Sequence, residues 1–206
     1  MASLTRRTEA QSSRREEVEA SVLAATERLL LNGASFAELK VERIATEAGL
    51  SRTAFYFYFR DKRELLMRLT EDVAELLYAS ADAWWSGDGD GPTELTRALE
   101  EVIGLYRSHA VMLRAVVEAS AYDEPVAGFW RALVGRFVEA TRERVEREQA
   151  AGEIAPLPAR ETAFALCWMT ERACYQRIME DGDLADPGFV EAIVRAWVGS
   201  LYGRVG

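Results

Sequence analysis

The stretch that decides the fold is VERIATEAGLSRTAFYFYF, residues 41–59. It has the pattern of a helix-turn-helix, in which two short helices are joined by a tight turn. Ala45 is small, so two helices can cross closely there, and Gly49 permits a left-handed residue in the turn. We therefore predict one helix over residues 41–48 and a second over 52–58. The side chains placed to form a small core are Ile44, Leu50, Phe55 and Phe59.

The outer side of the second predicted helix carries residue types that suit contact with DNA. A recognition helix places its N-terminal residues against base edges in the major groove. There Arg can bond to guanine through two hydrogen bonds and Thr can contact thymine, while tyrosine hydroxyls and lysine suit phosphate oxygens. For Phe57 two positions remain open, against DNA or packed against the helix that follows. The predicted DNA-binding residues are Lys40, Ser51, Arg52, Thr53, Tyr56, Phe57, Tyr58 and Lys62.

Helical periodicity also governs the chain on either side of this motif. Upstream, apolar residues recur at steps of three and four from Val18 to Leu29. A capping box at Ser13 and Glu16 predicts the start of that helix. Downstream, a long helix is expected from Asp61 to about Trp84, followed by a flexible Gly-rich loop at 87–92. Helices are then expected from residue 95, at about 108–119, around 130–145, and over 159–180 and 187–202.

Because strand signals are scarce, we predict an all-α fold of nine helices. Three small helices form a helix-turn-helix head, a long helix connects it to the body, and five helices form that body. The predicted domains are a flexible arm over 1–15, a DNA-binding head over 16–60, and a connector with its body over 61–206. The arm either reaches the minor groove or is a solvated tail, and its basic residues are Arg6, Arg7, Arg14 and Arg15.

Apolar and aromatic residues recur at helical steps in several body helices. So many large side chains at facing positions are hard to pack without voids, and apolar cavities bind ligands. Thr141 or Thr170 could orient a ligand with a hydrogen bond. Glu171 either contacts a ligand or pairs with Arg172 in a buried or interfacial ion pair. The predicted ligand-binding residues are Leu95, Leu99, Val102, Tyr106, Trp130, Val134, Phe137, Thr141, Phe164, Cys167, Trp168, Thr170, Glu171 and Trp197.

Composition and charge narrow the classes of function. The net charge is −9; residues 1–70 have a balance of +2 and residues 71–206 one of −11, so the head is the end that suits DNA. No apolar run approaches the roughly 20 residues of a membrane span, and no secretion signal begins the chain. Cys167 and Cys174 are too far apart on one helix to form a disulfide. With a single histidine, His109, no metal site is expected. These features favour a cytoplasmic protein.

Several segments resemble a known family. The run GLSRTAFYFYF at 49–59, with Asp61-Lys62 and ELL at 64–66 after it, closely resembles the TetR family of bacterial transcriptional regulators. The segments LCWMTER at 166–172 and WVGSLYG at 197–203 resemble the branch of that family that contains the ethionamide-resistance repressor. The resemblance implies a three-helix DNA-binding head, a connecting helix, a ligand-binding body, and dimerisation through the last two helices.

That branch carries a long, mostly apolar ligand channel, which the resemblance implies here too. Where the branch has two amide side chains in the channel, this chain has Cys167 and Thr170. The expected function is therefore a transcriptional repressor that binds double-stranded operator DNA as a homodimer. An apolar small-molecule effector releases it, and no cofactor or membrane is involved.

Two other classes of protein remain to be compared with this expectation. One is a constitutive DNA-binding protein whose body is filled and binds no effector. The other is an enzyme, which the sequence disfavours because it has no nucleophile–base pairing, no metal-ligand spacing and no phosphate-binding loop.

Overall fold

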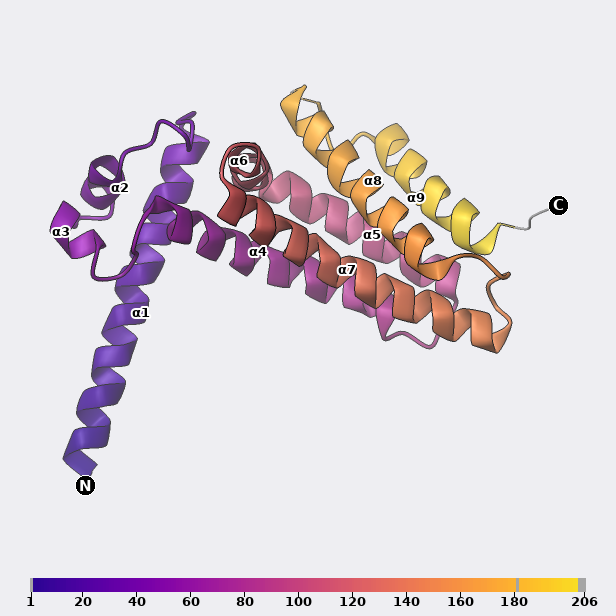
Figure 1. Ribbon diagram of the computed structural model, residues 1–206, viewed down its shortest axis with the longest axis horizontal. Helices are drawn as coiled ribbons and strands as arrows, with labels where there is room; N and C mark the ends of the chain where they lie inside the picture. Colours follow the sequence, from indigo (N-terminus) through magenta and orange to yellow (C-terminus); the bar gives the residue numbers. More distant parts are fainter. Residues whose placement is uncertain (1, 181, 204–206) are drawn as a thin grey trace. The chain divides into compact units, whose positions relative to one another are not determined.

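A computed structural model describes residues 2–180 and 182–203, with side chains from Arg14 onward (Figure 1). Over these residues the chain forms nine helices and no strand, as predicted. It divides into two compact units, residues 1–70 and 71–206, and the boundary falls within α4. The helices are α1 (Ala2–Leu31), α2 (Val41–Glu47), α3 (Arg52–Phe55), α4 (Lys62–Trp85), α5 (Gly91–Ser108), α6 (Ala110–Ser120), α7 (Glu124–Ala151), α8 (Ala159–Met179) and α9 (Pro187–Tyr202).

The first helix is longer than the sequence analysis predicted. It begins at Ala2 and not at a capping box near Ser13, so the predicted helix start was wrong. The reason is that residues 2–15 contain neither Gly nor Pro, and nothing in them ends a helix. Among the four arginines of the predicted arm, Arg15 forms an ion pair with Glu19 at 2.7 Å. The side chains of Arg6 and Arg7 lie outside the described residues.

The core of the first unit matches the prediction from the helix-turn-helix pattern. Ile44 and Phe55 are fully buried and Phe59 nearly so, and the rings of Phe55 and Phe59 lie 5.5 Å apart. Gly49 has a φ of 72°, in the left-handed region where a side chain would be strained. Leu50 is half-buried, and its N–H donates to the Ala45 carbonyl at 2.8 Å. These contacts hold α2 and α3 in a helix-turn-helix arrangement.

The second helix of the motif is shorter than predicted. α3 ends at Phe55, and residues 56–58 form turns in which the Phe57 N–H donates to the Ala54 carbonyl at 3.1 Å. The predicted end at Tyr58 was therefore wrong. The rings of Phe55 and Phe59 still meet beyond the end of α3, because the Phe59 N–H donates to the Phe55 carbonyl at 3.0 Å and keeps residues four apart on one face.

The second unit contains the end of α4 and helices α5 to α9. α7 packs along α8, and α5 packs along α9 (Figure 1). The predicted start of α9 is confirmed, since the Asp186 side chain accepts from the Gly188 N–H at 2.9 Å. α5 begins at Gly91, inside the loop predicted for residues 87–92. Asp90 caps it by accepting from the Thr93 N–H at 3.1 Å, and Pro92 fits a first turn.

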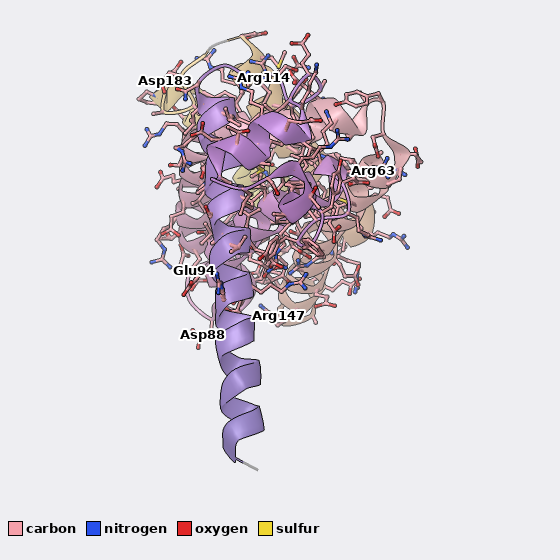
Figure 2. The ribbon with its side chains drawn as sticks, turned by 90° about the vertical axis from the view of Figure 1, so that its left-hand side faces the viewer. Arg63, Asp88, Glu94, Arg114, Arg147 and Asp183 are labelled. Atoms are coloured by element: carbon pink, nitrogen blue, oxygen red, sulfur yellow. The ribbon has the colours of Figure 1, made fainter. Side chains whose placement is uncertain are left out.

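A buried ion-pair network closes the end of the second unit where α4 meets α5, the region in which Figure 2 labels Asp88, Glu94 and Arg147. Arg144 on α7 is 2% exposed, and its Nε lies 2.6 Å from Glu148 Oε1. The Tyr202 hydroxyl donates to Glu148 Oε2 at 2.8 Å and accepts from Trp84 Nε1 at 3.1 Å. Arg144 also donates to the Gly87 carbonyl. The network joins α4, α7 and α9 by charge-assisted hydrogen bonds.

Candidate nucleic-acid interface and apolar cavity

The start of α3 presents exposed polar side chains. Ser51 caps the helix, since its Oγ accepts from the Ala54 N–H at 3.1 Å. Arg52 and Thr53 follow and are exposed. The Arg52 guanidinium forms an ion pair with Glu42 of α2 at 2.6 Å, with 61% of the arginine side chain exposed. Exposed ion pairs are weak, so the contact with Glu42 does little to fix the position of the Arg52 side chain.

The aromatic residues after α3 differ in exposure. Phe57 is 74% exposed and Tyr56 45%, whereas Tyr58 is half-buried. Two positions were open for Phe57, against DNA or packed against the helix that follows. A ring so exposed is not packed against the part of α4 that belongs to this unit. The Arg52 guanidinium lies 5.9 Å from the centre of the Tyr56 ring. Arg52 and Tyr56 thus form one exposed surface at the end of the motif, and Phe57 is exposed as well.

Lys62 does not lie on that surface. Its Nζ donates to the carbonyl oxygens of Phe36 at 2.9 Å, Ala37 at 2.7 Å and Leu39 at 3.3 Å. Burial lowers the pKa of its ammonium. The predicted contact of Lys62 with phosphate was therefore wrong. Three backbone carbonyls before α2 already use all three donors of its ammonium group. Sequence spacing placed the residue near the motif but could not indicate the direction of its side chain.

This position of Lys62 makes a prediction about stability. Lys62→Met should lower the free energy of unfolding by about 1–2 kcal/mol, because three carbonyls in part-buried or exposed contacts lose their charged donor. The slope of log affinity for DNA against log salt should stay unchanged. The exposed Lys40 is the matched control: Lys40→Met should leave the melting temperature unchanged and reduce that slope by about one. If Lys62→Met instead reduced the salt slope and left the melting temperature unchanged, Lys62 would contact phosphate after all.

The second unit contains an apolar cavity of about 80 Å³. All the predicted ligand-binding residues line it except Phe164 and Trp168. Sequence reasoning missed the contribution of α4, whose apolar stripe was assigned only to a connector. The lining residues are Leu77, Ala81, Trp84, Trp85, Leu95, Ala98, Leu99, Val102, Tyr106, Trp130, Leu133, Val134, Phe137, Thr141, Cys167, Thr170, Glu171 and Trp197.

Phe164 and Trp168 lie on another face of α8, so their prediction as cavity residues was wrong. Phe164 is 57% exposed, and its ring centre lies 6.3 Å from that of Trp168. Cys167, between them in sequence, is buried and faces the cavity. α8 is apolar on both faces, and for that reason its hydrophobic pattern could not separate the residues inside the protomer from those on its surface.

The polar groups of the cavity wall are mostly engaged with the protein. Thr141 Oγ1 accepts from Trp85 Nε1 at 3.1 Å, and Thr170 Oγ1 accepts from Trp197 Nε1 at 2.8 Å. The Cys167 thiol lies 3.7 Å from the Thr141 hydroxyl, and burial raises its pKa to about 12. A thiol held in the neutral form is a poor nucleophile. Both hydroxyls predicted to orient a ligand thus support indole rings.

Glu171 and Trp130 are the exceptions among these polar groups. Glu171 is 3% exposed, and neither carboxylate oxygen has a hydrogen-bond partner. Arg172 Nε lies 3.6 Å from Oε2, so the predicted ion pair forms, although 53% of the arginine side chain is exposed. Trp130 Nε1 on α7 is also buried without a partner. Burial raises the pKa of the Glu171 carboxyl, and Arg172 and the Trp130 N–H act in the opposite direction.

Within residues 2–180 and 182–203, no helix is both long and apolar enough to cross a lipid bilayer. In the same ranges, no three His, Cys, Asp or Glu residues are grouped to hold a metal ion.

Comparison with known families and proteins relates both units to transcriptional regulators. Residues 22–69 match the family described as bacterial regulatory proteins, tetR family, and residues 95–203 match the C-terminal domain of transcriptional regulator EthR. The HTH-type transcriptional regulator EthR of Mycolicibacterium smegmatis is 31% identical over 194 residues, covering 92% of this chain and 88% of that protein. EthR of Mycobacterium tuberculosis is 29% identical, covering 92% and 89%.

Solved structures show the same fold at lower sequence identity. NalD of Pseudomonas aeruginosa, the secondary repressor of the MexAB-OprM multidrug efflux pump, aligns with a TM-score of 0.71 at 18% identity, covering 92% of this chain and 98% of that one. A TetR transcription regulator of Haloarcula marismortui aligns with a TM-score of 0.70 at 19% identity, covering 88% and 95%.

Proposed function

Because the chain belongs to the TetR family of bacterial transcriptional regulators and carries an EthR-type C-terminal domain, we propose that it is an operator-binding repressor released by an apolar small molecule. The observation that carries the proposal is the apolar cavity, whose wall includes the C-terminal half of α4. The same helix begins in the DNA-binding unit, so a change at the cavity can act on the unit that binds DNA.

DNA binding by the first unit is proposed to use the exposed residues around α3. Arg52 and Thr53 lie at the start of the recognition helix and are exposed, where they would read base edges. Lys40, Ser51 and Tyr56 are also exposed and would contact phosphate. Phe57 and Tyr58 would complete the surface. Lys62 would act by holding the segment before α2 in place.

Dimerisation is proposed through α8 and α9. Phe164 and Met179 of α8 are exposed apolar residues, and Val194 and Val198 of α9 are half-buried. By contrast Ile193 and Leu201 are buried in the protomer and would not reach a partner. Two α8–α9 pairs would form a four-helix contact. A dimer would place two heads on successive major grooves, about 34 Å apart, in the cytoplasm where the chromosome lies.

The size of the cavity supports release by a ligand. At about 80 Å³ it is about half the size of an apolar cavity of about 150 Å³ that binds benzene in another protein. A larger apolar molecule would have to move its walls, including Leu77 and Ala81 on α4. Such a ligand binds the opened form better than the closed form, and this difference in affinity is what shifts an equilibrium.

The test uses 1-octanol as an apolar probe and the DNA upstream of the protein's own gene. Octanol should weaken DNA binding in fluorescence anisotropy and raise the melting temperature of free protein. Leu77→Trp should fill the cavity and weaken octanol binding about tenfold or more, because overpacking excludes the ligand. Leu76→Trp is the matched control, since Leu76 is 50% exposed and does not line the cavity.

Two outcomes would contradict this proposal. If octanol binds free protein and the DNA complex equally tightly, the cavity is not coupled to DNA binding. If no apolar probe binds while DNA binding is strong, the chain is a constitutive DNA-binding protein. Leu99→Phe repeats the filling test with a smaller change if Leu77→Trp does not fold.

A further inference from the structure

Among the described residues that line the cavity, Glu171 is the one that carries a charged side chain. Both of its oxygens are buried without hydrogen bonds. A buried polar group without a partner is costly. Its nearest cation, Arg172, is 3.6 Å away, is more than half exposed and lies 5.1 Å from the centre of the Tyr175 ring. Glu171, a residue of the cavity wall, therefore keeps free acceptor capacity.

The rest of the cavity wall, like the carboxylate of Glu171, favours a positively charged ligand. No Lys or Arg lines the cavity, so nothing there would attract an anion. Aromatic rings attract cations through their negative faces, most strongly when water is excluded, and the lining aromatics are Trp84, Trp85, Tyr106, Trp130, Phe137 and Trp197.

We propose that this cavity selects an organic cation, an apolar molecule with one protonated amine that donates to the Glu171 carboxylate. The inference rests on the proposed function and narrows its effector to amines. Arg172 would remain at the outer side of Glu171. The buried Trp130 N–H, which also lacks a partner, would donate to the same carboxylate once it is ionised. The hydrocarbon part would displace water from the apolar wall.

The state of Glu171 without ligand agrees with this assignment. Burial raises the pKa of its carboxyl, so the surroundings of Glu171 in the protein disfavour the charged form. A protonated amine beside it supplies the opposite charge and stabilises the carboxylate. An alcohol supplies a weaker neutral donor, and a carboxylate ligand would face a like charge.

The test compares three probes of equal chain length, octylamine, 1-octanol and octanoate, by isothermal titration of the full-length protein at neutral pH. Wild type should bind octylamine about tenfold or more tightly than octanol, as a charge-assisted hydrogen bond provides, and octanoate most weakly. Glu171→Gln keeps the shape but removes the charge. In that variant octanol affinity should stay within about twofold, and the preference for octylamine should fall to about one.

Glu161→Gln, on an exposed residue of the same helix that does not line the cavity, is the matched control and should keep the wild-type preference. Equal binding of octylamine and octanol by wild type would overturn the assignment, as would an undiminished preference in Glu171→Gln. If either result is found but octanol still binds and weakens DNA binding, the proposed function holds and only the preference for amines is wrong. If none of the three probes binds, both are wrong.

Discussion

Arg144→Met is expected to lower the free energy of unfolding by about 3–5 kcal/mol, the cost of removing one partner of a buried ion pair. Arg144 is 2% exposed and Glu148 3% by side chain. Without the guanidinium, Glu148 would keep only the Tyr202 hydroxyl as a donor. The Gly87 carbonyl would also lose its donor. Thermal and urea unfolding of the full chain measure the change.

Two further variants separate charge from packing in this experiment. Arg131→Met removes an arginine from the same helix that pairs with Glu124 and is 59% exposed, so it should cost less than about 1 kcal/mol. The double variant Arg144→Met with Glu148→Met removes both charges and should recover part of the loss. If Arg144→Met unfolds no more easily than Arg131→Met, the network does not stabilise this end of the unit.

Phe164→Glu is expected to convert a dimer to a monomer and to weaken binding to operator DNA by about a hundredfold or more. The ring is 57% exposed on α8, so the protomer should tolerate the change, whereas burying a carboxylate in an apolar interface is costly. The second head of a dimer binds at a high effective concentration, and a monomer loses this gain. Light scattering gives the mass and fluorescence anisotropy gives the affinity.

The control replaces an exposed aromatic residue away from α8 and α9. Tyr122, in the turn after α6, is 63% exposed, and Tyr122→Glu should leave both mass and DNA affinity unchanged. A Phe164→Glu protein that remains a dimer at micromolar concentration would place the interface elsewhere.

The head could be predicted from sequence because its decisive contacts are local. Ile44, Gly49, Phe55 and Phe59 lie within sixteen residues of one another, and helical spacing alone brings their side chains together. The same reasoning identified most of the cavity wall, because Leu95 and Leu99 on α5 follow the inward stripe of an amphipathic helix.

Tertiary structure decided the direction of individual side chains that could have faced either the protein interior or the surface. Lys62 turns to the carbonyls of Phe36, Ala37 and Leu39. Phe164 faces outward although Cys167, three residues away, faces the cavity. Arg144 reaches Gly87, 57 residues earlier in the chain. None of these three side-chain directions could be read from the spacing of residues along the sequence.

What the sequence by itself determined, then, is the order of the helices and the helix-turn-helix core, which depend on local spacing and capping. What only the tertiary structure decided is which polar side chains find partners. Trp85 and Trp197 find hydroxyl acceptors in Thr141 and Thr170, while Glu171 is left without a hydrogen bond. The physical reason is that a buried polar group is satisfied by atoms from other helices, whose positions follow from packing and not from spacing along the chain.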